Sequence, residues 1–322
     1  MPALAGPLLV LAFTLSQALR DVYFGAVFQG VDFFAIILLA FLLSTIIFAT
    51  VTLLRSPGEF AKLRGHGGSV LVANLTTALA WSCYFFALSH LDPSVVNTIH
   101  SGMGPLTVVV LGWFGIRLAQ ARPVSRLENI GYAGIAASII GLWWIVLSGR
   151  SGLSAENVIA SLAGLTLLSI SGASITLSLL YCKRLQDAGI SADAVTAVRY
   201  VALILLAGGI EIWKGRLGGI ETSQQLAVLS AATTTLIVLP LYTFQVGIGR
   251  TAPLTAHVIR ALGPIFVFAL AQLDGRINYS MPVLTCIVIY SASVIVSNLA
   301  HGWRDTPFEA KKKPLSVLQC DK

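Results

Sequence analysis

The segment from Phe33 to Leu54 reads FFAIILLAFLLSTIIFATVTLL, and none of its residues carries a charge. A helix of this length rises about 30 Å, which matches the hydrocarbon core of a bilayer. A closed β-barrel would instead show segments of about ten residues with alternating polarity. The stretch therefore predicts a membrane-spanning helix.

The composition of the whole chain agrees with this interpretation. Hydrophobic residues make up 56% of its 322 positions, charged residues only 11%, and the mean hydropathy is +0.83. A soluble domain carries about 25% charged residues. The net charge of +7 comes from basic residues scattered between apolar runs, so we expect no nucleic-acid binding. The composition predicts an all-α polytopic membrane protein with the lipid bilayer as its surroundings.

Apolar windows of about 20 residues, separated by charges and by Gly/Pro clusters, occur ten times. Links as short as Gly30–Asp32 and Leu91–Pro93 force antiparallel hairpins. The N-terminal sequence MPALAGPLLV has no basic residue, so the first span is expected to be a retained helix rather than a cleaved signal. The predicted spans are 7–28, 33–54, 70–90, 94–116, 129–148, 158–182, 194–213, 224–247, 253–272 and 281–300.

The positions of Lys and Arg predict the orientation, because basic residues accumulate in cytoplasmic loops. With a cytoplasmic N-terminus, fourteen of the 21 Lys and Arg fall in inner segments, four in outer loops and three inside spans. Both termini are then cytoplasmic. This arrangement requires an even number of spans, in agreement with the ten that are predicted. The tail from 303 to 322, with Lys311, Lys312 and Lys313, is expected to be a basic cytoplasmic anchor, and the cell inner membrane is the expected location.

The chain also repeats itself weakly at a spacing of 159 residues. DPSVVNTIHSGMGPLTVVV (92–110) aligns with TAPLTAHVIRALGPIFVFA (251–269), so that Gly104-Pro105 meets Gly263-Pro264. Five spans per half is an odd number, and the second half must therefore enter the membrane inverted. We expect a first five-helix repeat over 1–148 and a second, inverted one over 149–302. Inverted repeats are typical of secondary transporters, whose substrates bind near the midplane.

These features resemble the drug/metabolite transporter superfamily, in particular its EamA-type members, over about residues 7–300. The resemblance rests on the five-plus-five spans, the short links before the fourth and ninth spans, the Gly-Pro pairs within them and Arg199-Tyr200 early in the seventh. It implies transport of amino acids, drugs, nucleotide sugars or sugar phosphates. The Gly-Ala-Leu-Asn-Lys motif of the nucleotide-sugar branch is replaced by VIRALGP (258–264).

Charged residues inside spans are costly and need a reason. Arg260 lies near the middle of the ninth span, where Pro264 leaves the carbonyl of Arg260 without its helical donor; it is the first candidate for substrate binding. Arg20 and Asp21 are adjacent on the first span and point about 100° apart, so we expect no ideal ion pair between them and a partner on another helix for at least one. They line a cavity or pair structurally. Arg199 either extends to the cytoplasmic membrane surface, which its position near the end of the span favours, or lines the cavity.

Further candidates for substrate contact combine an aromatic or apolar body with a polar tip. A histidine in a span is either a proton relay or a hydrogen-bonded packing residue, and the aromatic residues suit an amphipathic ligand or simple packing. The candidates are Trp81, Tyr84, His100, Tyr242, Gln245 and His257.

No motif for catalysis or for a cofactor is found in the sequence. Cys83, Cys182, Cys286 and Cys320 show no metal-ligand spacing, and no nucleotide-binding or hydrolase motif occurs. We therefore expect no enzyme activity, no metal and no cofactor. Small residues in the fifth span, such as Gly131 and Gly134, predict close helix contact and a possible homodimer seam.

Three functions fit these observations. The leading one is a secondary transporter whose cavity holds Arg20, Arg260 and Arg199 against Asp21, a net positive charge that suits an anionic or carboxylate-bearing metabolite. The second is an exporter of neutral amphiphilic or zwitterionic compounds such as amino acids or drugs. The third is a membrane scaffold or enzyme without transport.

Overall fold

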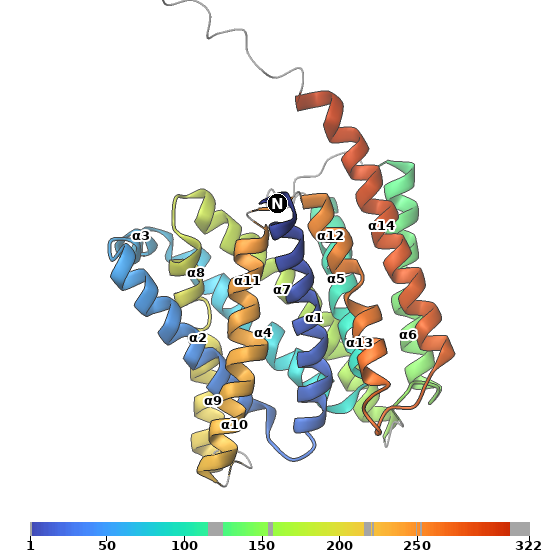
Figure 1. Ribbon diagram of the computed structural model, residues 1–322, viewed down its shortest axis with the longest axis horizontal. Helices are drawn as coiled ribbons and strands as arrows, with labels where there is room; N and C mark the ends of the chain where they lie inside the picture. Colours follow the sequence, from blue (N-terminus) through green and yellow to red (C-terminus); the bar gives the residue numbers. More distant parts are fainter. Residues whose placement is uncertain are drawn as a thin grey trace, which may run out of the picture.

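A computed structural model describes residues 2–114, 125–153, 157–215, 220, 222–248, 250–251 and 253–309. Within this part of the chain the regular structure is entirely helical (Figure 1). The helices up to residue 147 are α1 (Pro2–Val27), α2 (Phe33–Arg55), α3 (Glu59–Leu63), the 3-10 turn η1 (Arg64–His66), α4 (Gly67–His90), α5 (Pro93–Trp113) and α6 (Arg126–Leu147).

The helices after residue 157 are shorter on average, because several are interrupted. They are α7 (Val158–Asp187), α8 (Ala192–Val198), α9 (Val201–Lys214), α10 (Ser223–Thr233), the π-helical segment η2 (Thr234–Val238), α11 (Leu239–Ile248), α12 (Pro253–Ala261), α13 (Gly263–Ala271) and α14 (Met281–Glu309).

Nine helical segments of the described chain are long and apolar enough to span a membrane. They coincide with nine of the ten predicted spans, and the predicted ninth falls on a shorter apolar helix, Thr255–Ala271. Large apolar side chains such as Leu54, Ile212 and Trp213 are more than 80% exposed, as expected where lipid replaces water. The protein is an integral, multi-pass, helical membrane protein.

Polar side chains at the helix starts fix the short links. Asp32 accepts a hydrogen bond from the backbone N–H of Phe34 (2.8 Å) and begins α2, and Asp92 accepts from that of Ser94 (2.8 Å) and begins α5. These contacts satisfy backbone donors that have no partner inside the helix. The sequence links therefore end one helix and begin the next within two or three residues, as the hairpin prediction required.

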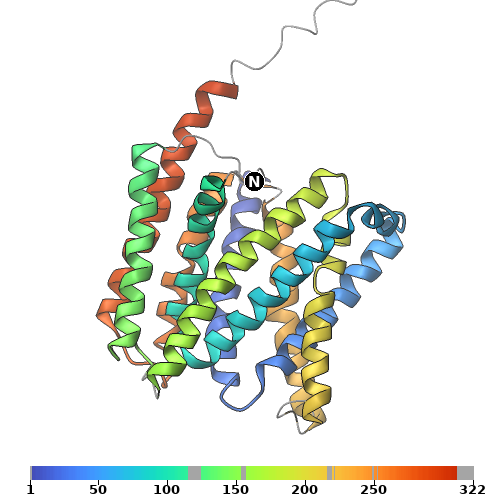
Figure 2. The same cartoon turned by 180° about the vertical axis from the view of Figure 1, so that it is seen from behind.

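α1 lies near the middle of the bundle (Figure 1), and the other helices pack around it. α4 and α7 run side by side for most of their length, as Figure 2 shows from behind, and α5 also packs on α7. α11, α12 and α13 pack on α1, and α13 also contacts α5. α6 and α14 form one edge of the molecule in both views.

Small residues of α6 are used inside the molecule. A Cβ atom on Gly131 would lie 2.6 Å from the Cβ of Ser297, and one on Gly134 would lie 2.1 Å from the Oγ of Ser293. Both serines belong to α14, so these glycines allow α6 and α14 to approach closely. The close contact predicted for the fifth span is present within the chain, and the homodimer stays a prediction.

The contact of α2 with α8 and α9 is fixed at both ends. At one end Lys214, the last residue of α9, forms an ion pair with Asp32. At the other end the contact is made by α3, which follows α2: the backbone N–H of Ser191 donates to Glu59 (2.6 Å), while the Lys62 ammonium donates to the carbonyl of Gly189 (3.2 Å). We call these contacts the α2 clamps.

Candidate functional site

A buried polar network occupies the middle of the bundle, between α1, α4 and α5. The Arg20 guanidinium donates to Asp21 Oδ1 from Nε (2.8 Å) and from Nη2 (2.6 Å), and Nη2 also donates to the Tyr84 hydroxyl (3.1 Å). Asn97 on α5 donates to the second oxygen of Asp21 (2.7 Å). Arg20 is 6% exposed and Asp21 fully buried, so each charge is compensated where water cannot reach it.

The ion pair corrects one prediction and confirms another. Adjacent helix positions do diverge, but the long arginine side chain folds back beside its neighbour, and the expectation that Arg20 and Asp21 form no good pair is wrong. The expected partners on other helices are present, since Tyr84 and Asn97 complete the network. We call Arg20, Asp21, Tyr84 and Asn97 the α1 network.

Aromatic rings surround the α1 network on the side of α4. The guanidinium carbon of Arg20 lies 5.4 Å from the ring centre of Trp81 and 5.3 Å from that of Tyr84, within range of a cation–π contact. The indole N–H of Trp81 is buried and has no hydrogen-bond partner among the described residues. Two of the predicted aromatic candidates are thus placed beside Arg20.

His100 joins this cluster from α5. Its ring meets that of Tyr84 edge-on, with ring centres 4.6 Å apart, and its Nδ1 lies 3.1 Å from the hydroxyl of Ser171 on α7. Ser171 carried no signal in the sequence beyond being a small polar residue of the sixth span. Asn97 could have been found, because it lies three residues before His100 and so shares its helix face.

Arg260 lies at the end of α12, directly before the helix stops at Leu262. Unlike Arg20, it is exposed, and no carboxylate of the described residues forms a salt bridge with it. Its guanidinium carbon lies 5.1 Å from the ring centre of Phe244, which in turn stacks on Phe13 of α1 (4.2 Å). A Cβ atom on Gly263, three residues after Arg260, would lie 3.6 Å from Oδ1 of Asn97. The break after Arg260 therefore lies beside the stretch of α5 that carries Asn97 and His100, which Arg20 approaches from α1.

The break beside Arg260 confirms the effect predicted for Gly263-Pro264. The N–H of Ile265 bonds to Leu262 (3.0 Å) instead of continuing the α-helical pattern, and the carbonyl of Ala261 instead accepts from the Ser291 hydroxyl of α14 (2.8 Å). Neither Phe244 nor Ser291 was a sequence candidate, because their relation to Arg260 depends on tertiary packing.

The remaining candidates are less central. Tyr242 is 51% exposed, and no hydrogen bond of its hydroxyl is found within the described residues. His257 is exposed, one turn before Arg260 on α12. The side chain of Gln245 lies outside the described part of the structure.

Arg199 lies where α8 ends and α9 has not begun. Its guanidinium carbon is 5.1 Å from the ring centre of Tyr200, which is buried and packs on Phe41 (4.7 Å). Its Nε atom is buried without a hydrogen-bond partner among the described residues. The extension of this side chain to the membrane surface stays a prediction.

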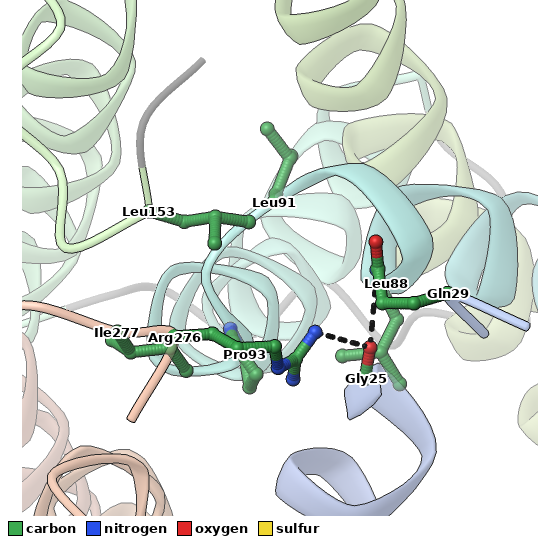
Figure 3. A pocket seen from close by; sticks show the side chains of 8 residues that line it. All are labelled: Gly25, Gln29, Leu88, Leu91, Pro93, Leu153, Arg276 and Ile277. Carbon is green, nitrogen blue, oxygen red and sulfur yellow. Dashed lines mark hydrogen bonds between the residues drawn. The ribbon is translucent and has the colours of Figure 1, made fainter. Parts of the chain in front are cut away.

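Two hollows lie away from these charges, at the end of the bundle where α1 finishes. The larger, about 340 Å³, is lined by residues of the α1–α2 link and the start of α10, among them Val31 and Gln225. The smaller lies between four interhelical links (Figure 3). There Arg276 (3.0 Å) and Gln29 (3.3 Å) both donate to the carbonyl of Gly25.

An ion pair and a buried cap strengthen that end of the bundle. Arg276 holds both oxygens of Asp274, and these hydrogen bonds lower the pKa of the Asp274 carboxyl. Asp92 is 2% exposed, and burial raises its pKa although Ser94 donates to it twice. Polar contacts thus hold the links together at this end of the bundle, whereas Arg260 is exposed.

Comparison with known proteins identifies the fold but no family. No family model matches the chain, and no curated protein matches it. A solved structure described only as "Crystal structure of protein" is similar over 94% of this chain and 98% of that chain, with a TM-score of 0.57 and 17% identity. At this identity the similarity shows a shared fold alone, and the resemblance to EamA-type transporters stays a prediction.

Proposed function

We propose that this protein is a secondary transporter that moves a small anionic or carboxylate-bearing solute by alternating access. The observation that carries the proposal is Arg260, a cation at mid-span that is exposed, lies beside a helix break and has no carboxylate partner among the described residues. A charge kept at that depth faces water or a ligand rather than lipid. Broken helices beside a binding site are common in transporters.

The packing supports two related halves. Pairing the five spans that end with α6 with the five that begin with α7 matches α1 with α7, α4 with α11 and α5 with α13. The packing of α4 and α5 on α7 then corresponds to that of α11 and α13 on α1, and both sets of contacts occur. The contacts α6–α14 and α5–α13 each join two matched helices, so exchanging the halves leaves them unchanged. An inverted pair of this kind offers two similar packings, one open to each side. With the Lys/Arg distribution, this supports cytoplasmic termini in a cell inner membrane.

A second candidate substrate class is favoured by the α1 network. Because Asp21 neutralises Arg20, Arg260 supplies the net charge of this cluster, surrounded by the rings of Trp81, Tyr84 and Phe244. Such a site also suits a neutral amphiphile or a zwitterionic amino acid. A thermal-shift screen with anionic, zwitterionic and neutral compounds separates the two classes, because a bound ligand stabilises the folded state.

The proposal is tested by replacing Arg260 in protein reconstituted into vesicles. Arg260→Gln removes the charge but keeps hydrogen bonding, and Arg260→Lys keeps the charge but loses the planar fork. A hydrogen bond to a charged group contributes about 1.5–3 kcal/mol, so we expect Gln to weaken anion transport about 10- to 100-fold and Lys to retain part of it.

Arg250→Gln is the matched control, because Arg250 lies exposed in the link before α12. Transport should be unchanged in this variant. Normal anion transport by Arg260→Gln would exclude the anion site. Loss of the folded protein in Arg260→Gln would make Arg260 a structural residue and favour the neutral or zwitterionic class.

A further inference from the structure

The hydrogen bonds of Ser171 determine where His100 carries its proton. The Ser171 hydroxyl lies 2.6 Å from the carbonyl oxygen of Ala80, which can only accept, so the single hydroxyl proton is used there. The same oxygen lies 3.1 Å from His100 Nδ1 and must accept from it. Neutral His100 therefore carries its proton on Nδ1, and its Nε2 presents a lone pair.

Within the described residues, His100 Nε2 has no hydrogen-bond partner. Arg20 reaches the histidine through Tyr84, whose ring touches the imidazole, and Arg260 interacts with it from α12. The ring of Tyr290 lies against α5, because a Cβ atom on Gly102 would be 3.2 Å from its Cε2. The titratable and charged groups around His100 are thus Arg20 and Asp21 on α1, Tyr84 on α4, Arg260 on α12 and Tyr290 on α14.

The other helices packed on α5 add no charge at this level. α13 contains no titratable residue, and α7 contributes the hydroxyl of Ser171. α6 meets α5 through Ile135 and Ile139, which approach Gly102, whereas Glu128 and Tyr132 lie closer to the start of α6. The balance around His100 is two guanidinium groups against one carboxylate, and that carboxylate is already engaged by Arg20 and Asn97.

We propose that a solute carboxylate binds between Arg260 and His100, and that His100 takes up one proton at Nε2 as the carboxylate binds. The inference rests on the proposed function and names its coupling ion. Without a solute, a proton on Nε2 would add a third cation to the cluster, which like-charge repulsion opposes. A bound carboxylate supplies the missing negative charge. One of its oxygens accepts from Nε2–H, and the other accepts from the guanidinium.

The proton balance of this step is simple. The proton comes from water on the side from which the solute enters, forms an N–H bond with the Nε2 lone pair and leaves to water when the carboxylate leaves. No covalent bond of the solute changes. A monocarboxylate that crosses together with one proton carries no net charge, so its transport is electroneutral. The rings of Trp81, Tyr84 and Phe244 favour a monocarboxylate with an apolar body.

Calorimetry measures the proton directly. Benzoate is titrated into the purified protein in two buffers of different ionisation enthalpy, between pH 7 and pH 8. We expect uptake of one proton per benzoate, and by linkage an affinity that rises about tenfold for each unit that the pH falls. Binding of benzoate without proton uptake overturns the inference but leaves the transporter proposal standing. If benzoate, lactate and succinate all fail to bind, the proposed anion site falls as well.

Two variants assign the proton to His100. His100→Gln keeps an amide N–H for Ser171 but cannot take up a proton, so it should bind benzoate with a proton uptake near zero and a flat pH dependence. The matched control is His90→Gln, because His90 is also bonded to a serine (Ser89, 2.8 Å) but is exposed at the end of α4. This control should behave as the wild type. Uptake that persists in His100→Gln places the proton elsewhere and overturns the inference.

A measurement that keeps His100 covers the case in which His100→Gln does not fold. The chain has five histidines, and replacing the other four by Gln leaves His100 as the single imidazole. Nitrogen-15 NMR of this protein at pH 7.5 should show a neutral, Nδ1-protonated ring without benzoate and an imidazolium with it. A ring that stays neutral in the presence of bound benzoate contradicts the proposal.

Discussion

The helices before and after residue 150 differ in continuity, although both parts are equally apolar. α2, α4 and α5 each run without interruption for more than twenty residues. Among the later helices, α8 and α9 are separated at Arg199 and Tyr200, η2 is π-helical, and α12 stops at Ala261 before α13 begins. The early helices hold a compensated and buried ion pair, while in the later ones Arg199 and Arg260 lie at the breaks between α8 and α9 and between α12 and α13.

The two Gly-Pro pairs show how this difference arises. Proline has no N–H, so Pro105 and Pro264 each free a carbonyl one turn earlier. α5 continues through Pro105, whereas the chain at Leu262 changes its bonding pattern and frees the carbonyl of Ala261 as well. Ser291 of α14 donates to that carbonyl. The same dipeptide is therefore compatible with a continuous helix or a broken one, and in the broken helix a neighbour satisfies the extra acceptor.

The largest effect should follow from breaking the ion pair of the early helices. Asp21→Asn leaves the Arg20 charge buried without its counter-charge, and loss of one partner of a buried pair costs about 3–5 kcal/mol. We expect the free energy of unfolding, measured by denaturant titration in detergent, to fall by that amount. Asp187→Asn is the control, because the pair of Asp187 with Lys183 is exposed, and it should change stability little. Equal losses in both variants would mean that burial of the α1 network contributes nothing.

A smaller effect is expected at the break of the later helices. Ser291→Ala removes the donor to the Ala261 carbonyl, and an unsatisfied buried acceptor costs about 1–3 kcal/mol. The same unfolding experiment measures it. Thr285→Ala on the same helix is the matched control, because the Thr285 hydroxyl bonds only to its own helix (Met281, 3.0 Å) and faces outward. If Ser291→Ala is as stable as this control, the break does not depend on α14.

The smallest effect concerns the pair of Asp274 and Arg276 at the end of the bundle. Hydrogen bonds from Arg276 lower the pKa of Asp274 from its ordinary value of 3.8, so the pair stabilises the folded state above that pH and the contribution is lost as the pH falls through the lowered pKa. Because Arg276 is partly exposed, we expect Asp274→Asn to cost about 1 kcal/mol or less. Melting temperatures of wild type and variant should differ at pH 6, and the difference should shrink as the pH falls below 3.8 and through the lowered pKa. A difference that does not shrink as the pH is lowered below 3.8 would show that charge is not its cause.

The sequence was sufficient for the membrane class because that signal is local. An uncharged run such as 33–54 leaves few alternatives to a spanning helix, and each predicted span coincides with a helix or with an interrupted pair of helices. The hairpins at 30–32 and 91–93 were equally predictable from the shortness of these links, whereas the capping hydrogen bonds of Asp32 and Asp92 were not foreseen. Pro264 indicated where the ninth span could break, because the missing N–H is a property of one residue, but the continuous helix at Pro105 shows that the dipeptide alone does not determine a break.

The partners of the buried charges were beyond the reach of the sequence. That Arg20 folds back on Asp21 depends on the rotamer of a long side chain, and that Ser171 holds His100 depends on the packing of α5 against α7. The contact of Arg199 with the buried ring of Tyr200 likewise depends on where α8 ends and α9 begins. Such outcomes follow from tertiary contacts, which a span-by-span reading does not contain.

The α2 clamps have a mechanical consequence. Asp32 at the start of α2 is tied to Lys214 at the end of α9, and Glu59 of α3, which follows α2, is tied to Ser191 at the start of α8. A movement that keeps both ties carries α2, α3, α8 and α9 together as one rigid body. Because α12 packs mainly on α14 and α1, a movement of the helix that carries Arg260 would break neither tie.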